Sequence, residues 1–142
     1  MPPEADIDIP NVDIDGMSDY LSGQDLEFAV LFGSYARGDS DSSSDVDVAI
    51  GFPAEVDDHE RFRRRNRIDA ELQAYADAFV DVSDIESLPV PVAHNALREG
   101  IRLAGTVEAI DEYQNRIEAN SDPEADDRER QAFIDRLARG DV

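Results

Sequence analysis

The chain has 142 residues, 41% of them hydrophobic, which is enough for one domain with a substantial core. It contains no cysteine, so disulfides and thiolate metal sites are excluded. Its 34 acidic residues outnumber its 13 basic ones and give a formal net charge of -21, which argues against non-specific binding to DNA or RNA.

Residues 1–25 are acidic and contain few large apolar side chains. We expect them to form an extended, partly ordered N-terminal arm, as chain ends often do. The alternating runs at 6–9 and 12–15 are also compatible with edge strands. One helical turn is expected at 18–22, just before the first strand.

Two short apolar runs frame the most informative stretch of the chain. Residues 28–32 and 46–50 are bounded by Gly, Ser and Asp, a pattern that predicts two strands. A Gly-Ser step and a short helix or loop connect them. Because side chains alternate across a strand, Asp45 and Asp47 share one face, roughly 6–7 Å apart, while the intervening valines face the core.

A carboxylate pair beside a Gly-Ser step is typical of a site for magnesium and phosphate. Two like charges this close repel, and each raises the proton affinity of the other. Mg²⁺ removes that cost and is usually held by one or two carboxylates plus substrate phosphates. The backbone at Gly33 can approach a ligand closely, and the Ser34 hydroxyl can donate to phosphate oxygens. Arg37 either contacts phosphate or anchors the loop.

Other interpretations of this stretch stay open. The run 39–44, rich in Asp and Ser, is by itself typical of a solvated turn. An EF-hand calcium loop fails in detail, because Ser44 and Ile50 stand where that loop needs Gly and a bidentate Glu. The acid pair could also belong to an exposed edge strand, although the apolar residues that follow favour a buried one.

The residue pattern of segment 57–79 predicts a helix. Its recurring face, at three- and four-residue spacing, is made of Phe62, Arg65, Ile68, Asp69, Leu72, Tyr75, Ala76 and Phe79. The segment also holds a basic cluster of Arg61, Arg63, Arg64, Arg65 and Arg67. These arginines either pair with the surrounding acids on a solvated face or form a docking surface for an acidic partner or for nucleotide phosphates.

Segment 78–85 predicts a third strand that contains acidic residues. An acid among apolar strand residues is costly unless it is paired or binds a metal. Asp81 lies between two valines, and Asp84 lies toward the strand end. Asp81 is therefore the stronger candidate for a site residue, and Asp84 is the runner-up, whose alternative role is a helix or turn cap.

The remaining chain predicts further short elements. We expect a helix at 91–99 that stops at Gly100, a short strand at 101–104 and a helix at 106–119. Residues 120–127 then read as an acidic linker and 128–139 as an amphipathic helix. Such a helix either folds back on the core or docks onto a partner.

The Gly33-Ser34 step, ten further residues and then Asp45-x-Asp47 resemble the signature of the polymerase-β-like nucleotidyltransferases, and most closely that of the minimal nucleotidyltransferases (MNT) of prokaryotes. The resemblance covers roughly residues 26–104. It implies an α+β fold with a small mixed β-sheet and helices packed on one face. We therefore expect an acidic arm at 1–25, a nucleotidyltransferase domain at 26–119, and a linker with a C-terminal helix at 120–142.

The resemblance also implies the chemistry of the site. In this family a third carboxylate follows on a neighbouring strand in an apolar-Asp-apolar pattern, which falls on Asp81. Asp45, Asp47 and Asp81 would then hold two Mg²⁺ ions, and Asp81 would take the proton of the attacking hydroxyl. Gly33, Ser34 and Arg37 would bind the nucleotide, which is ATP.

Small proteins of the resembled kind act with a helical HEPN ribonuclease toxin. The resemblance therefore implies an antitoxin that transfers an adenylyl group from ATP to a toxin tyrosine. Two alternatives stay open. One is an antitoxin that neutralises its partner by binding alone, and the other is a small-molecule nucleotidyltransferase of the antibiotic-resistance kind.

The charge and the hydropathy pattern bear on the environment of the protein. All 13 basic residues are arginine, and the acidic excess would repel itself in dilute buffer. Molar salt screens this repulsion, because the Debye length falls to about 3 Å. We therefore expect a protein from a salt-accumulating halophile, such as a haloarchaeon. With no membrane-spanning run and no signal peptide, a cytoplasmic location without membrane contact is expected.

Overall fold

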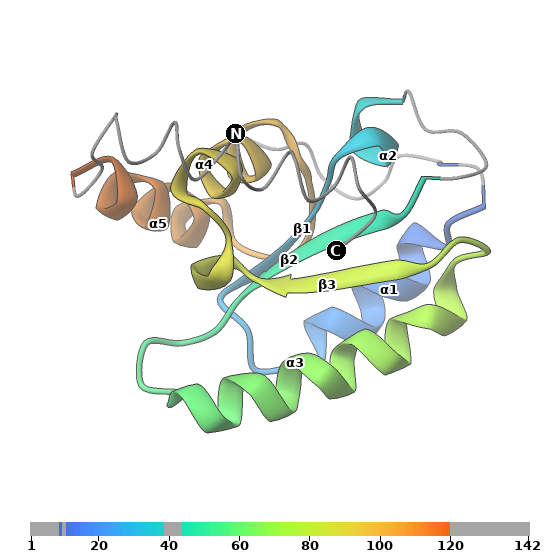
Figure 1. Ribbon diagram of the computed structural model, residues 1–142, viewed down its shortest axis with the longest axis horizontal. Coiled ribbons are helices and arrows are strands. Elements are labelled where there is room, and N and C mark those ends of the chain that lie inside the picture. Colours follow the sequence, from blue (N-terminus) through green and yellow to red (C-terminus); the bar gives the residue numbers. More distant parts are fainter. Residues whose placement is uncertain (1–8, 10, 39–43, 120–142) are drawn as a thin grey trace.

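The computed structural model describes residue 9 and residues 11–38 and 44–119 (Figure 1). Its elements in chain order are α1 (Ile14–Ser22), β1 (Phe28–Phe32), α2 (Ser34–Arg37), β2 (Val46–Gly51), α3 (Asp58–Leu72), η1 (Gln73–Tyr75), β3 (Val80–Asp84), η2 (Ile85–Ser87), α4 (Val90–Glu99), β4 (Ile101–Gly105) and α5 (Val107–Ala119). The predicted linker and helix at 120–139 lie outside the described residues.

The four strands form one mixed sheet in the order β3-β2-β1-β4. Strand β1 pairs antiparallel with β2 and β4, and β2 pairs parallel with β3. The predicted strands at 28–32, 46–50, 78–85 and 101–104 are confirmed with small changes at their ends. The expected α+β fold with a small mixed sheet is therefore confirmed.

Helices cover both faces of the sheet, so the expectation that they pack on one face is wrong. Ala29 and Leu31 of β1 belong to a core cluster with residues of α1 and α3. Phe28 and Val30, which alternate with them, belong to a second cluster with residues of α4 and α5. The two helix pairs lie on opposite sides of the sheet in Figure 1. The physical reason is that β1 is apolar at every position, so each of its faces requires a cover.

Helix α1 corrects the expectation for the N-terminal part of the chain. The predicted extended arm is wrong over residues 14–22, which form a nine-residue helix instead of a single turn. Ile14, Met17 and Leu21 are buried in the core, and the Asp13 side chain caps the helix by accepting the Gly16 amide at 3.0 Å. These apolar residues are few but recur on one helical face, and that face packs next to β4.

Helix α3 ends at Leu72, seven residues before the predicted end at Phe79. A 3-10 turn follows, and Ala76 is already extended. The Gln73 side chain bonds both backbone groups of Val80, accepting from its amide at 2.9 Å and donating to its carbonyl at 2.7 Å. The chain must reverse here to start β3, and helical spacing of apolar residues could not show this reversal.

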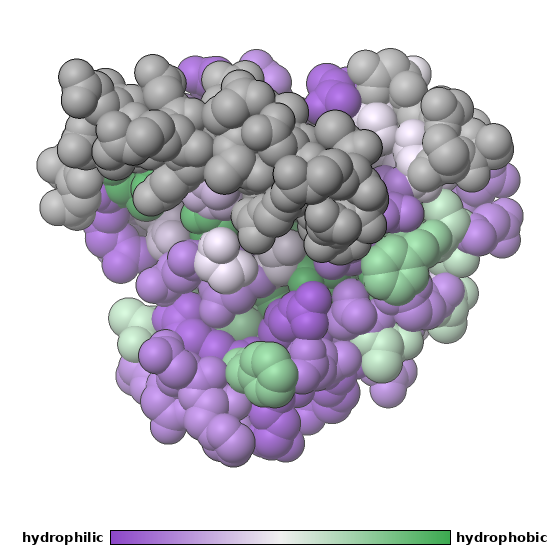
Figure 2. All heavy atoms as spheres, in the orientation of Figure 1, coloured by the Kyte–Doolittle hydropathy of each residue, from purple (hydrophilic) through white to green (hydrophobic). Residues whose placement is uncertain are grey.

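The helices predicted at 91–99 and 106–119 are confirmed as α4 and α5, and Gly100 follows the end of α4 as expected. No helix in the described part of the chain is both long and apolar enough to cross a bilayer. Most of the surface visible in Figure 2 outside the grey atoms is hydrophilic, with separate hydrophobic spots. Phe62 and Phe79 are the large hydrophobic side chains most exposed among the described residues, at 65% and 54%.

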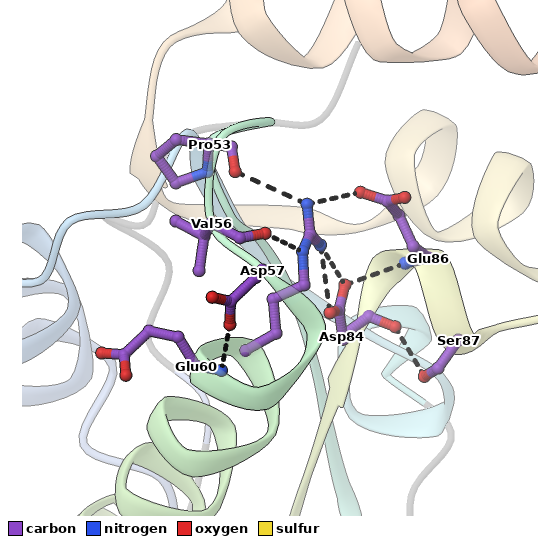
Figure 3. A network of polar contacts seen from close by, with 8 residues as sticks. Pro53, Val56, Asp57, Glu60, Asp84, Glu86 and Ser87 are labelled. Carbon is purple, nitrogen blue, oxygen red and sulfur yellow. Dashed lines mark hydrogen bonds and ion pairs between the residues drawn. The ribbon is translucent and has the colours of Figure 1, made fainter.

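Arg61 is a buried charge, 9% exposed, that joins three segments of the chain (Figure 3). Its Nε donates to the Val56 carbonyl at 3.0 Å, and one Nη donates at the edge of hydrogen-bond range, 3.5 Å, to the Pro53 carbonyl. Its guanidinium also pairs with Asp84 at 3.2 Å and with Glu86 at 2.9 Å. The loop after β2 is thereby tied to the end of β3 and to η2.

The other arginines of the cluster mostly pair with acids, as one of the two interpretations expected. Arg63 and Arg64 both bind Glu60, at 2.6 and 2.7 Å. These two ion pairs lower the pKa of Glu60 to about 2, through the hydrogen bonds that the guanidinium groups donate. Arg65 is paired with Asp81, one of the predicted site residues, at 3.9 Å.

Candidate functional site

The turn between β1 and α2 brings backbone close to a carboxylate. Gly33 has a φ of 79°, which side-chain-bearing residues rarely adopt. A Cβ atom added there would lie 2.5 Å from Oδ2 of Asp47. Glycine therefore suits this position for two reasons: a side chain would strain the backbone conformation, and it would displace the Asp47 carboxylate.

Sheet register places two of the predicted acids side by side. Asp47 of β2 is the direct partner of Asp81 in the parallel β2–β3 pair. On its other side Asp47 faces Phe32, the residue before Gly33. Side chains of register partners point to the same face of a sheet, so the carboxylates of Asp47 and Asp81 share one face. Helices α4 and α5 cover the other end of this face. The valines that alternate with Asp47 are fully buried on the opposite face, as predicted.

Asp45 lies directly before β2 and is exposed. Its charge raises the pKa of Asp47 and that of Asp81, so the three acids form one electrostatic group. The structure thus brings Asp45 and Asp47 to the Gly33 turn, as their spacing indicated, and adds Asp81, as the resemblance implied.

Burial and mutual repulsion dominate the electrostatics of this group. Burial of the carboxyl group, then the charges of Asp81 and Asp45, raise the pKa of Asp47 to about 7, against a smaller lowering by Arg37. Burial also raises the pKa of Asp81, and the Arg65 guanidinium counteracts part of that rise. A carboxyl group with a pKa near neutrality in a polar site marks a candidate functional position.

The residues present fit a magnesium ion that is completed by substrate. Among residues 9, 11–38 and 44–119, no three acidic or histidine side chains are arranged as a ready-made metal cage. Mg²⁺ does not require such a cage, because it usually binds one or two carboxylates together with phosphates and water. The donors here are hard oxygen atoms, and a cation would relieve the repulsion that raises the pKa of Asp47.

Helix α2 presents the other predicted site residues. Ser34 is its first residue, Tyr35 is buried in the core and anchors it, and Arg37 is exposed in its last turn. The Arg37 amide donates to the Gly33 carbonyl at 3.1 Å, which closes the turn. Ser34 and Arg37 therefore lie on the element that follows Gly33, next to the strand that carries Asp47.

The structure separates Asp81 from the runner-up, Asp84. Asp84 pairs with Arg61 and accepts the Glu86 amide at 3.0 Å, so it caps η2 as its alternative role predicted. It is the register partner of Ile50 at the far end of β2, away from Asp47. Asp84 is a structural residue in this fold.

Sequence reasoning missed one set of residues beside the site: Arg65, Asp69 and Gln73 of α3 and η1. Their side chains bond the backbone of β3 on both sides of Asp81. A signal for them existed in the sequence, because Arg65 and Asp69 are polar residues on the recurring face of the predicted helix.

Replacing Asp47 by asparagine should stabilise the folded chain at alkaline pH when no divalent cation is present. The carboxyl group ionises near pH 3.8 in the unfolded chain and near 7 in the folded one. As pH rises through this window, ionisation of the unfolded state lowers the stability of the wild type, whereas the asparagine variant is unaffected. Above pH 7 the difference is constant.

Three pH units correspond to roughly 4 kcal/mol, and partial solvent access reduces this to about 2 kcal/mol. Urea unfolding at pH 5 and pH 8, with chelator and at one KCl concentration, measures the effect. We expect the Asp47→Asn variant to be more stable at both values, with the larger gap at pH 8. A gap that does not grow with pH would contradict the raised pKa.

Comparison with known proteins gives a family and several relatives. A family model described as Polymerase beta, Nucleotidyltransferase matches residues 16–109. The protein adenylyltransferase MntA of Shewanella oneidensis is 29% identical over 118 residues, which cover 78% of this chain and 75% of that protein.

Solved structures share the fold. A chain of a toxin-antitoxin crystal structure with AMP-PNP matches with a TM-score of 0.57 and 23% identity, over 87% of this chain and 98% of that one. A chain of the structure of a tri-AMPylated Shewanella oneidensis HEPN toxin in complex with an MNT antitoxin matches with a TM-score of 0.51 and 21% identity, over 88% of this chain and 98% of that one.

The family match spans about two thirds of the chain, from within α1 to the first turn of α5. It includes the Gly33 turn and all three acids of the site, and the solved structures agree on the mixed sheet with its helices. The chain therefore belongs to the polymerase β nucleotidyltransferase family.

Proposed function

We propose that this chain is a Mg²⁺-dependent protein adenylyltransferase that transfers AMP from ATP to a tyrosine of a partner HEPN ribonuclease toxin and thereby acts as its antitoxin. The observation that carries the proposal is the register pairing of Asp47 with Asp81 next to the Gly33 turn. The relatives support the choice of acceptor, since one is named a protein adenylyltransferase and others are toxin-antitoxin structures, one with an AMP-modified HEPN toxin.

Each site residue has a part in the proposed reaction. Asp45, Asp47 and Asp81 would hold two Mg²⁺ ions, and bound Mg²⁺ supplies charge neutralisation for the triphosphate and its leaving pyrophosphate. Gly33 carries no side chain, so its backbone can approach phosphate closely, and the Ser34 hydroxyl would donate to a phosphate oxygen. Arg37 adds positive charge at the same end of the sheet, as its effect on the pKa of Asp47 indicates.

Asp81 is the residue that acts on the hydroxyl group of the acceptor tyrosine. Its carboxylate receives the proton of the tyrosine hydroxyl as that oxygen attacks the α-phosphorus and pyrophosphate leaves. The place of Asp81 beside Asp47, on the outer strand of the site, supports this assignment.

The surroundings of the reaction are part of the same proposal. The domain at 26–119 carries the chemistry, with α1 packed onto it. The acidic, lysine-free composition suits a halophilic host, so assays belong in molar KCl. The reaction takes place in the cytoplasm, where ATP is available.

The test is a labelling and capture experiment with a HEPN toxin as the partner. With α-labelled ATP and Mg²⁺ in molar KCl, the wild type should label a toxin tyrosine, which mass spectrometry locates. The Asp81→Asn variant should still capture the toxin in a pull-down but leave it unlabelled, because it retains the fold and loses the proton acceptor.

Two outcomes would favour the alternatives. If the Asp81→Asn variant protects cells from the toxin as well as the wild type does, neutralisation is by binding alone. If the wild type binds ATP but labels an aminoglycoside-type small molecule in place of the toxin, the acceptor in the proposal is wrong and the transfer chemistry stands.

A further inference from the structure

Asp81 lies on the least supported strand of the site. In the sheet order β3-β2-β1-β4 of the described residues, β3 is an edge strand that pairs with β2, whereas β2 pairs on both sides. An edge strand leaves a row of backbone groups without strand partners. The position of Asp81 beside Asp47 therefore depends on what holds the outer edge of β3.

A stripe of polar side chains from α3 and η1 lies along this edge and bonds the backbone of β3. Gln73 bonds both the amide and the carbonyl of Val80. The Asp69 Oδ1 atom accepts the Val82 amide at 3.0 Å, and Arg65 Nε donates to the Val82 carbonyl at 2.7 Å. The three side chains are four residues apart, so they lie along one face of the helix. They bond the two residues that flank Asp81.

Arg65 extends further than the other two side chains of the stripe. Besides its bond to the Val82 carbonyl, its Nη2 lies 3.9 Å from Oδ1 of Asp81, and its Nη1 donates to Asn66 at 2.6 Å. Each nitrogen of the guanidinium thus has a partner, Nε and Nη1 through hydrogen bonds and Nη2 through the longer ion pair with Asp81. Helix α3 lies along β3 on the opposite face of the sheet (Figure 1). The pair between Arg65 and Asp81 therefore connects this helix with the face that carries the site.

We propose that Arg65 and Asp69 are positioning residues for the transfer reaction: they hold β3 at Val82 and thereby keep the Asp81 carboxylate beside Asp47. This inference rests on the proposed function. Arg65 contributes in two ways, because it anchors the backbone next to Asp81 and places a positive charge beside its carboxylate. That charge acts against the rise that burial causes in the pKa of Asp81.

Protection of the sheet edge alone would produce the same hydrogen bonds, so the test must separate positioning from stability. Residues that orient metal ligands typically change activity or metal affinity 10- to 100-fold when they are replaced. A side chain that only covers an edge changes the melting temperature and leaves the turnover of the folded molecules as it was.

The first variant is Arg65→Lys, which keeps the charge but cannot bond Val82 and Asp81 in the same planar geometry. We expect kcat to fall about 10- to 100-fold with the KM for ATP changed less than about twofold. The dissociation constant for Mn²⁺ alone, measured by electron paramagnetic resonance without nucleotide, should rise about 10-fold. Arg63→Lys on the same helix, whose arginine pairs with Glu60, is the matched control and should change neither quantity.

The second comparison uses Asp69 and isolates one hydrogen bond. Asp69→Asn removes the charge but keeps an oxygen that accepts the Val82 amide, whereas Asp69→Ala removes both. We expect Asp69→Asn to retain kcat and Mn²⁺ affinity and Asp69→Ala to lose about 10-fold in each. If Arg65→Lys does not fold, the comparison of the two Asp69 variants still tests the positioning role.

The outcomes distinguish this inference from the proposed function. If the wild type transfers AMP and folded Arg65→Lys matches Arg63→Lys in kcat and Mn²⁺ affinity, the positioning role is wrong and the stripe only covers the edge. Equal values for Asp69→Asn and Asp69→Ala would overturn it in the same way. If the wild type does not transfer AMP, the proposed function fails, while the Mn²⁺ affinities still decide the positioning of Asp81. A wild type that neither transfers nor binds Mn²⁺ overturns both.

Discussion

Replacing Asp45 and Asp47 together by asparagine is expected to lower the rate of adenylyl transfer at least roughly a thousandfold and to leave the fold intact. Asp47 lies at the centre of the site, between Gly33 and Asp81, and Asp45 adds its charge directly before β2. Asparagine has nearly the shape of aspartate but lacks the charge that holds Mg²⁺, so the catalytic loss comes without a packing defect.

The measurement is transfer of labelled AMP in molar KCl, with circular dichroism to verify the fold. A matched control is Asp19→Asn with Asp25→Asn, which removes the same two charges from exposed positions away from the site. That control should keep the wild-type rate. If the site double variant were to transfer AMP as fast as the control, these carboxylates would have no part in the chemistry.

Replacing Arg61 by methionine should destabilise the chain by about 3 kcal/mol, the effect typical of removing one partner from a buried ion pair. Methionine fills much of the space of the arginine stem, so the loss reports on the charge and its hydrogen bonds. Asp84 and Glu86 would lose their cation, and the carbonyl of Val56 would lose its donor. For a chain of this length the melting temperature should drop by roughly 10 °C.

Differential scanning calorimetry in molar KCl measures this drop, and Arg63→Met is the control. Arg63 also pairs with an acid, Glu60, but on the surface, where ion pairs contribute little. We expect the melting temperature of that variant to stay close to that of the wild type. Similar drops for both variants would mean that burial of Arg61 adds nothing and that the loss of any positive charge destabilises this acidic chain.

The elements that the sequence predicted well are those whose signal is local. The strands at β1 and β2 are short apolar runs with polar boundaries, and their ends are marked by residues such as Gly33. Gly33 and Asp47 both lie in the stretch from β1 to β2, two strands that pair with each other, so this part of the site is local in the sequence. Local patterns of this kind persist whatever the rest of the fold does.

Other features depended on contacts between distant segments. In the sequence, the nine residues of α1 resemble the rest of the acidic N-terminal part. Only the fold shows that three of their side chains are buried and that the helix packs beside β4. Helix α3 stops at Leu72 because Gln73 bonds Val80, a contact that helical spacing cannot reveal. Whether Asp81 or Asp84 joins the site is decided by the parallel register, which pairs Asp81 with Asp47.

Positioning of the third acid likewise came from tertiary structure alone. In the sequence Arg65 is one arginine of a basic cluster and lies on the recurring face of the predicted helix, but nothing local shows that it bonds Val82 or pairs with Asp81. The fold places α3 along the outer edge of β3, which has no strand partner in the part of the chain that the structure describes. Composition and motif thus determined the chemistry available to this chain. The edge position of β3 decided which side chains hold Asp81 in place. The reason is that backbone groups without a strand partner must bond to side chains of the element beside them.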